Sequence, residues 1–326
     1  MKAVLCVRHA PPEALEIVDL PDPVAGPGEV VVEVAAVGLN FFDTLIIRNL
    51  YQQKPDLPFS PGGEFAGRVL ALGPGVTGPK VGTRICGNVG YGAARERLVV
   101  RADRLAIVPD DLDLVRAAGL IITYGTSLYA LRDRGELKAG ETLVVLGAAG
   151  GVGLAAVELG KILGARVIAC ASSPDKIAFA RSHGADIGID YTTENLKLRL
   201  KELTGGDGAD VVYDPVGGDL SEQALRSLGW CGRLLVIGFA AGEIPKLPLN
   251  LLLLKNCDAR GVAFGTQAMR DPAWLTATIT ELMGYARSGA ISAHVDATFP
   301  LERCAEALGE IAGRKVKGKV VLTTGL

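Results

Sequence analysis

The residues with the clearest chemical meaning form a glycine-rich turn between an apolar run and a helix-like segment. Residues 142–146 read Thr-Leu-Val-Val-Leu, a pattern typical of a buried strand, and Gly147-Ala-Ala-Gly-Gly-Val-Gly153 follows directly. A strand, a glycine turn and a helix in this order bring backbone N–H groups close to a ligand phosphate, because glycine has no Cβ. We therefore predict a dinucleotide-binding loop whose pyrophosphate contacts are Gly150, Gly151, Val152 and Gly153.

Two glycines of this loop have different expected roles. Gly150 would let the backbone approach the phosphates, and Gly153 would let the helix pack closely on the strand. The strict G-x-G-x-x-G spacing is absent, because Ala148 stands where the first glycine is expected. The alternative is an ordinary turn between a strand and a helix, and the surrounding elements argue against it.

The end of the next apolar run indicates which dinucleotide would bind. An NAD site needs an acidic residue about 20 residues after the loop. Here the run ends in Ser172 and Ser173, and Lys176 follows one helical turn later. Two hydroxyls and an ammonium suit a 2′-phosphate, so we predict NADPH. The alternative is that Ser173 caps a helix beginning at Pro174 and that Lys176 is a solvated surface residue, and Asp175 argues mildly against a phosphate.

The elements around the loop repeat regularly. Apolar runs begin near residues 142, 166, 187, 210, 232 and 258, and helix-like segments such as 154–163 and 175–182 separate them. Runs that are apolar throughout are typical of parallel strands covered on both faces. Six such units predict an α/β fold with a doubly wound parallel sheet of the Rossmann type.

The chain before about residue 110 is β-rich and punctuated by turns at 21–28 and 73–82, which predicts a small barrel or sandwich. The expected strands are Lys2–Val7, Ala14–Leu20, Glu29–Gly38, Arg68–Leu72, Arg84–Asn88 and Arg95–Val100. Helical stretches follow at 113–119 and 123–134. The last 60 or so residues carry helices at 272–288 and 301–312 and a strand at 317–323, and we expect them to pack on the first domain.

Composition excludes several classes of protein. The net charge of −2 and the lack of a basic block argue against nucleic acid as a partner. The six cysteines stand singly, which disfavours a structural zinc lobe. The longest apolar stretch, 143–157, is too short to span a membrane, and the N-terminus does not resemble a signal peptide. We expect a soluble cytoplasmic protein.

A series of short motifs lies in order along the whole chain: Gly38-Leu-Asn-Phe-Phe-Asp43, Leu50-Tyr51, Pro58-Phe-Ser-Pro-Gly-Gly-Glu64, Gly75-Val-Thr-Gly with Lys80-Val-Gly-Thr-Arg84, Ala148-Ala-Gly-Gly-Val-Gly153, Tyr213-Asp-Pro-Val-Gly217 and Gly318-Lys-Val-Val. In this order the motifs resemble those of the medium-chain dehydrogenase/reductases, in particular their zinc-free quinone oxidoreductase (zeta-crystallin-like) branch. The resemblance implies a GroES-like β-rich catalytic domain at 1–122, completed by 266–326, and a Rossmann NADPH-binding domain at 123–265. It also implies a homodimer.

The resemblance bears on metal content as well. Zinc-dependent relatives carry a cysteine at the position of Asn40, a histidine at that of Gly63 and a further cysteine near Ile122. Glu64 alone remains, and one carboxylate without thiolate or imidazole cannot hold a catalytic zinc ion. We therefore expect no metal.

The resemblance also suggests which side chains act on the substrate. Asn40 and Tyr51 are expected to donate to a developing oxyanion, Thr126 to lie beside the nicotinamide, and Asp43 to orient its neighbours. Leu45 replaces a tyrosine of many relatives, so the pocket is expected to be more apolar. The alternatives are a helix cap for Asn40, a loop anchor for Tyr51 and a core hydroxyl for Thr126.

Further cofactor contacts are implied at later strand ends: Tyr191 beside the adenine, and Phe239, Phe264 and Gly265 near the carboxamide and ribose. The aliphatic run Leu251–Leu254 is either a core helix or a subunit interface.

The leading hypothesis is an NADPH-dependent, zinc-independent reductase of a small-molecule quinone or other conjugated carbonyl (enone). One alternative is reduction of the C=C bond of alkenals or enoyl thioesters. The other is a non-enzymatic, NADPH-binding structural or RNA-binding protein, against which the lack of Arg/Lys clusters argues.

Overall fold

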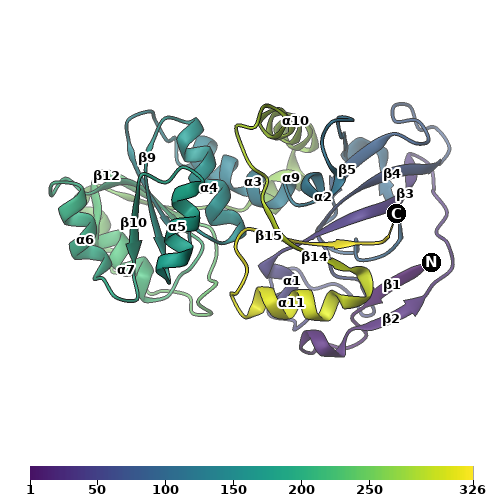
Figure 1. Cartoon of the computed structure of the whole chain (residues 1–326), viewed down its shortest axis with the longest axis horizontal. Coiled ribbons are helices and arrows are strands. Elements are labelled where there is room, and N and C mark those ends of the chain that lie inside the picture. The colour runs from purple at the N-terminus through teal and green to yellow at the C-terminus, as the bar shows by residue number, and fades with distance from the viewer. Residues whose placement is uncertain (326) are drawn as a thin grey trace. The chain divides into compact units, whose positions relative to one another are not determined.

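The computed structural model describes residues 1–325, and the chain divides into two compact units (Figure 1). The first unit comprises Met1–Ile122, Gly265–Gly289 and Ala293–Leu326. The second comprises Thr123–Phe264 and Ala290–Ser292. Each is described separately below.

The second unit contains a six-stranded parallel sheet in the order β10-β9-β8-β11-β12-β13. Counted along the chain this order is 3-2-1-4-5-6, that of a doubly wound dinucleotide-binding sheet, so the predicted fold class is confirmed. The strands are β8 (Thr142–Leu146), β9 (Arg166–Ala171), β10 (Ile187–Asp190), β11 (Ala209–Asp214), β12 (Leu228–Val236) and β13 (Asp258–Gly261). The helices are α3 (Ile121–Leu128), α4 (Gly151–Ile162), α5 (Pro174–Ser182), α6 (Leu196–Leu203), α7 (Asp219–Arg226) and α8 (Asn250–Lys255).

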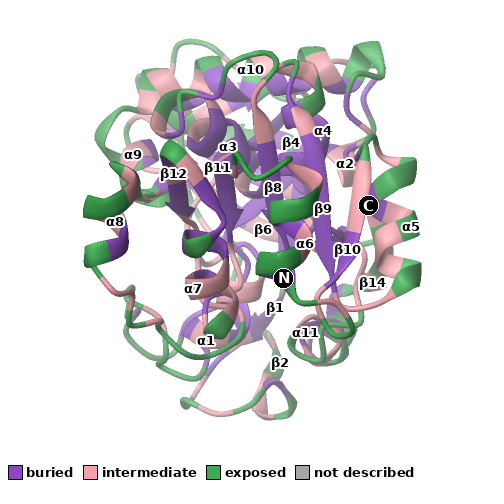
Figure 2. Cartoon of the chain, turned by 90° about the vertical axis from the view of Figure 1, so that its left-hand side faces the viewer, coloured by how far each residue is buried: buried purple, intermediate pink, exposed green. Residues whose placement is uncertain are grey.

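The central strands are covered on both faces, which is why their sequences are apolar throughout. Every residue of β9 after Arg166 is buried, and Figure 2 shows β8, β9 and β11 in the buried colour while α5, α6 and α8 carry exposed residues. The expected start of β12 near Gly232 is wrong, because the strand begins at Leu228. Its pairing with β11 is irregular: Ala209 pairs with Leu228, but Val211 pairs with Arg233. The residues of β12 in between, with Cys231 at φ 59°, form a bulge.

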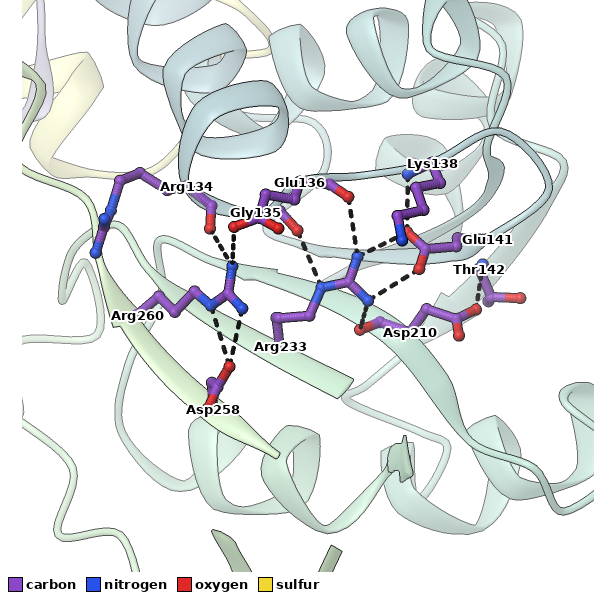
Figure 3. A network of polar contacts seen from close by, with 10 residues as sticks. All are labelled: Arg134, Gly135, Glu136, Lys138, Glu141, Thr142, Asp210, Arg233, Asp258 and Arg260. Atoms are coloured by element: carbon purple, nitrogen blue, oxygen red, sulfur yellow. Dashed lines mark hydrogen bonds and ion pairs between the residues drawn. The ribbon is translucent and has the colours of Figure 1, made fainter. Parts of the chain in front are cut away.

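A polar network closes one end of this sheet (Figure 3). The helix predicted at 123–134 ends as α-helix at Leu128 and continues as a wider π-helix over Tyr129–Arg134. Arg233 donates to Gly135 O (3.0 Å) and to the Glu141 carboxylate (2.7 and 2.9 Å). These contacts lie at the N-terminal ends of the strands. Ligands of doubly wound sheets bind at the opposite, carboxyl ends, which this network leaves free.

The first unit is built on a mostly antiparallel seven-stranded sheet in the order β14-β15-β3-β4-β5-β7, in which β6 also pairs with β3. The strands are β3 (Glu29–Leu39), β4 (Glu64–Leu72), β5 (Arg84–Asn88), β6 (Arg97–Arg101), β7 (Leu105–Ile107), β14 (Val295–Pro300) and β15 (Lys319–Thr323), and β1 (Lys2–Leu5) pairs separately with β2 (Glu16–Asp19). All expected strands are present, although β4 begins four residues earlier than predicted and β7 and β14 were not predicted.

The end of the chain returns to this sheet. Strand β15 pairs antiparallel with β3, for example Val320 with Leu39, so the expected packing of the last residues on the first domain is confirmed. The helices of the unit are α1 (Phe41–Ile46), α2 (Leu114–Ala118), α9 (Phe264–Arg270), α10 (Pro272–Ser288) and α11 (Cys304–Ala312), and α9 starts at the last residue of the second unit's main segment. Within residues 1–325 no helix is long and apolar enough to cross a bilayer.

Candidate functional site

The glycine loop has the geometry of a phosphate cradle. Helix α4 begins at Gly151, with Gly150 as an extended N-cap. A Cβ on Gly153 would lie 2.2 Å from Gly147 O, so only glycine lets the helix start sit against the end of β8. A Cβ on Gly150 would meet nothing nearer than Gly147 O at 3.4 Å, so the space beside this glycine is open. The free N–H groups of the first turn of α4 can bind an anion there.

Ser127 and Tyr213, which the sequence did not indicate as functional, support the glycine loop through hydrogen bonds. Ser127 Oγ lies 2.9 Å from two carbonyl acceptors, Val152 O and Thr123 O, and 2.8 Å from Tyr213 Oη. Both side chains are fully buried, and burial raises the pKa of the Tyr213 phenol. Their signal in the sequence was weak, because a serine inside a helix and a tyrosine inside a strand fit an ordinary core equally well.

The end of β9 brings Ser172, Ser173 and Lys176 together. Lys176 Nζ donates to Ser172 Oγ at 3.3 Å, while Ser173 Oγ accepts from Lys176 N at 3.3 Å as the N-cap of α5. The capping role of Ser173 is therefore confirmed, but a hydroxyl that accepts one bond still has its own hydrogen to donate. Tyr191 lies beside the same strand end, because its N–H donates to Ala171 O at 3.2 Å.

The later strand ends carry the other predicted cofactor residues. Phe239 follows β12 and packs on the turn after β11, where a Cβ on Gly217 would be 3.0 Å from its ring. Phe264 packs on α3, where a Cβ on Gly125 would be 2.7 Å from its ring, next to the buried Thr126. These residues belong to the second unit, whereas Gly265 opens the next segment of the first unit.

The predicted substrate residues of the first unit cluster at the start of α1. Asn40 caps the helix, and its backbone N–H donates to Asp43 Oδ2 at 2.8 Å. Gly62 N donates to Asp43 Oδ1 at 2.9 Å, so this buried carboxylate joins the helix to the loop before β4. Burial raises the pKa of Asp43 to about 7, outweighing the two hydrogen bonds that lower it.

Tyr51 lies near the same carboxylate. Its ring stacks on Phe42, with the ring centroids 5.4 Å apart. Burial, followed by the negative charge of Asp43, raises the pKa of the Tyr51 phenol. The hydroxyl is therefore protonated at neutral pH and can act as a hydrogen-bond donor.

Asn40 also takes part in a buried ionic network that the sequence reasoning missed. Lys319 Nζ donates to Asn40 Oδ1 at 2.5 Å and lies 2.6 Å from Glu64 Oε1. Asn40 Nδ2 donates to the same Glu64 oxygen at 2.9 Å. The available signal was a lysine at the head of the apolar run Val320–Leu322, where a charged residue is unusual unless it is paired.

The surroundings of Gly63 leave little space for an imidazole. A Cβ there would lie 2.6 Å from the ring of Phe42 and 3.1 Å from Gly90 O. Among the described residues, no group of three or more His, Cys, Asp or Glu side chains is arranged to hold a metal ion.

The buried Asp43 makes stability depend on pH. An aspartate has a pKa of about 3.9 in an unfolded chain, against about 7 here. The folded chain therefore keeps a proton that the unfolded chain loses, so this stabilising contribution is complete below pH ~4 and disappears as the pH rises through ~7. We expect the free energy of unfolding of the wild type to fall between pH 5 and 8, relative to Asp43→Asn, by roughly 2–3 kcal/mol.

Urea unfolding at several pH values measures this difference. Asp103→Asn is the control, because the pKa of that exposed carboxyl is already lowered by Arg101 and it does not titrate in this range. Parallel pH profiles for the wild type and Asp43→Asn would contradict the expectation.

Comparison with known proteins shows to which family the chain belongs. Residues 26–110 match the family model described as "Alcohol dehydrogenase GroES-like domain", and residues 151–278 match "Zinc-binding dehydrogenase". The chain is 39% identical to quinone oxidoreductase-like protein 2 of Rattus norvegicus over 99% of this chain and 92% of that one. It is 38% identical to a quinone oxidoreductase of Pseudomonas aeruginosa over 98% and 99% of the two chains. The chain belongs to the quinone oxidoreductase branch of the medium-chain dehydrogenase/reductase family.

A solved member of this family has the same fold. The structure of Escherichia coli quinone oxidoreductase complexed with NADPH superposes with a TM-score of 0.93 at 32% identity, covering 99% of this chain and 100% of that one. The GroES-like model matches within the first unit, and the second family model covers most of the Rossmann sheet. One of the two matched descriptions names zinc.

Proposed function

We propose that this protein is an NADPH-dependent reductase that transfers hydride to quinones and needs no metal. The observation that carries the proposal is the pairing of an open glycine cradle at the end of β8 with Ser172 and Lys176 at the end of β9, in a chain whose quinone oxidoreductase relatives match along nearly its whole length. Bound NADPH supplies the hydride. The protein binds and orients the two reactants and stabilises the charge that develops on the acceptor oxygen.

The residues divide into two groups in this proposal. One group holds the cofactor: Gly150, Gly151, Val152 and Gly153 at the pyrophosphate, Ser172, Ser173 and Lys176 at the 2′-phosphate, and Tyr191, Phe239, Phe264, Gly265 and Thr126 along the rest of the dinucleotide. The other group serves the acceptor, with Asn40 and Tyr51 as hydrogen-bond donors and Asp43 as the residue that holds Asn40 in place. Leu45 makes the acceptor pocket more apolar.

A panel of acceptors tests the function. Oxidation of NADPH is followed at one concentration of ortho- and para-quinones, alkenals and enoyl thioesters, with and without a chelator. We expect turnover with quinones that the chelator does not change. Loss of activity with the chelator would overturn the proposal, as would a protein that oxidises alcohols with NADP+ but reduces none of these acceptors.

The same panel separates the alternatives. Turnover with alkenals or enoyl thioesters but not with quinones would assign the protein to C=C reduction. Retention of NADPH without turnover of any acceptor would favour a binding protein. A cytoplasmic location and the absence of nucleic acid among its partners remain predictions.

We also propose that the protein is a homodimer through the edge of the Rossmann sheet. Strand β13 ends that sheet, and α8, in contact with β12, carries Leu253 and Leu254 at 81% and 68% exposure (Figure 2). Trp230, in β12, is 73% exposed. An open strand edge flanked by large apolar side chains fits a second copy of the same edge. Light scattering should give twice the chain mass, and Leu253→Glu should give the monomer; a monomeric wild type would refute this part.

A further inference from the structure

Lys319, Glu64 and Asn40 form a buried polar network in the first unit. All three side chains are buried, at 4%, 0% and 8% exposure. The chain makes room for them, since a Cβ on Gly119 would be 2.9 Å from Lys319 Cγ and one on Gly38 would be 2.8 Å from Glu64 Oε1. A buried ion pair with this much local accommodation is costly to build and so suggests a role.

The chemistry of the network fixes the orientation of the Asn40 amide. An ammonium has no lone pair and an ionised carboxylate has no hydrogen, so the amide oxygen must face Lys319 and the amide nitrogen must face Glu64. The distances agree, at 2.5 Å for Lys319 Nζ to Asn40 Oδ1 and 2.9 Å for Asn40 Nδ2 to Glu64 Oε1. The other Glu64 oxygen accepts from Ile122 N at 2.7 Å, which holds the carboxylate in place.

The two hydrogens of the Asn40 amide are held unequally. Of the two hydrogens on Nδ2, one is directed to Glu64, and the other has only a long contact of 3.4 Å to Gly38 O. That second N–H is the part of Asn40 able to bind an acceptor oxygen. If the amide turned over, its oxygen would take this place and repel the oxyanion instead.

We propose that Lys319 and Glu64 are positioning residues that hold the Asn40 amide with an N–H toward the acceptor. The pair acts through Asn40 and does not itself touch the substrate. This inference rests on the proposed function, because it concerns the oxygen that Asn40 would bind during quinone reduction.

The test uses the double variant Glu64→Gln/Lys319→Met. It removes both charges at once, so that neither is left buried without its partner, and its folding is checked by the Tm. We expect a folded protein whose NADPH Kd, measured by fluorescence, stays close to that of the wild type, while kcat with a quinone falls about 10- to 100-fold because the donor is misplaced. Lys315→Met is the matched control, since Lys315 is also ion-paired, to Glu310, but is 70% exposed.

A cycle with Asn40→Ala decides whether the pair acts through Asn40. In the Asn40→Ala protein we expect the double substitution to lower kcat by less than about 2-fold, because residues that act as a unit are not additive. Equal losses in both backgrounds would overturn the inference, as would an unchanged kcat. A raised NADPH Kd with unchanged kcat would assign Lys319 to cofactor binding and overturn it too.

The single variant Lys319→Arg adds a further check. The guanidinium keeps the charge and can donate to both oxygens, so we expect Lys319→Arg to retain more of the wild-type kcat than Glu64→Gln/Lys319→Met does. Failure of the wild type to reduce any quinone would refute the proposed function, and this inference with it. Normal turnover by the wild type and by Glu64→Gln/Lys319→Met alike would refute the inference alone.

Discussion

Gly150→Ala should weaken NADPH binding by about 10- to 100-fold while leaving the Tm unchanged. The backbone at Gly150, with φ −79° and ψ 169°, suits any residue, and an added Cβ would meet only Gly147 O at 3.4 Å. The methyl group would instead fill the open space beside Gly150, the N-cap of α4. The phosphates would then be kept from the N–H groups that bind them.

Gly153→Ala should act differently, although the two glycines are only three residues apart. Its Cβ would lie 2.2 Å from Gly147 O and 2.9 Å from Ala148 Cα, which are backbone atoms that cannot turn aside. The start of α4 must move away from β8, so we expect both a lower Tm, by several degrees, and weaker NADPH binding.

Gly309→Ala is the control for both changes, because it lies inside α11 and its added Cβ would contact nothing. Thermal unfolding and fluorescence titration with NADPH measure the two effects. A Gly150→Ala protein that binds NADPH as tightly as the wild type would show that the phosphates lie elsewhere.

The second large effect is expected on the choice of cofactor. Lys176→Ala should lower the ratio of kcat/KM for NADPH to that for NADH by about 10- to 100-fold, since a hydrogen bond to a charged group contributes about 1.5–3 kcal/mol. The two cofactors differ only in the 2′-phosphate. The ammonium of Lys176 and the hydroxyl of Ser172, which lie 3.3 Å apart, are the groups positioned to bind that phosphate together.

Lys201→Ala provides the control, because Lys201 is an exposed lysine of the same unit on α6. Its ratio should match that of the wild type. High salt should also reduce the preference of the wild type for NADPH, because screening weakens the attraction between the partly exposed Lys176 and the phosphate. An unchanged ratio in Lys176→Ala would mean that Lys176 is a surface residue of α5 that does not bind the 2′-phosphate.

The parts of the fold that could be predicted are those with a local cause. The six strands of the Rossmann sheet are visible because each is a short apolar run buried on both faces, and α10 was placed correctly at Pro272–Ser288 because Asp271 and Pro272 open it and Gly289 closes it. Its N-cap bond, from Trp274 N to Asp271 Oδ1 at 3.0 Å, follows from that short pattern.

The elements that the sequence did not predict have no local sequence pattern and depend on contacts with distant parts of the chain. Strand β14, Val295–Pro300, alternates between intermediate and exposed residues, and it exists because it pairs with β15. Strand β7 has three residues and is held by its pairing with β5. The π-helical turn after Leu128 carries no pattern of its own, and its far end is held by Arg233 and Arg260, whose contacts span 98 and 126 residues of the chain.

The sequence by itself determined the cofactor loop, because a strand, a glycine turn and a helix N-terminus are consecutive and their geometry is local. It also determined that histidine and cysteine are missing at Gly63 and Asn40. Only the tertiary structure decided which side chains contact Asn40, namely those of Lys319 and Glu64. Lys319 and Glu64 are far from it in sequence, and they reach it because β15 pairs with β3 and β3 with β4. The partners of a buried charge are chosen by the register of strands, which no single stretch of sequence records.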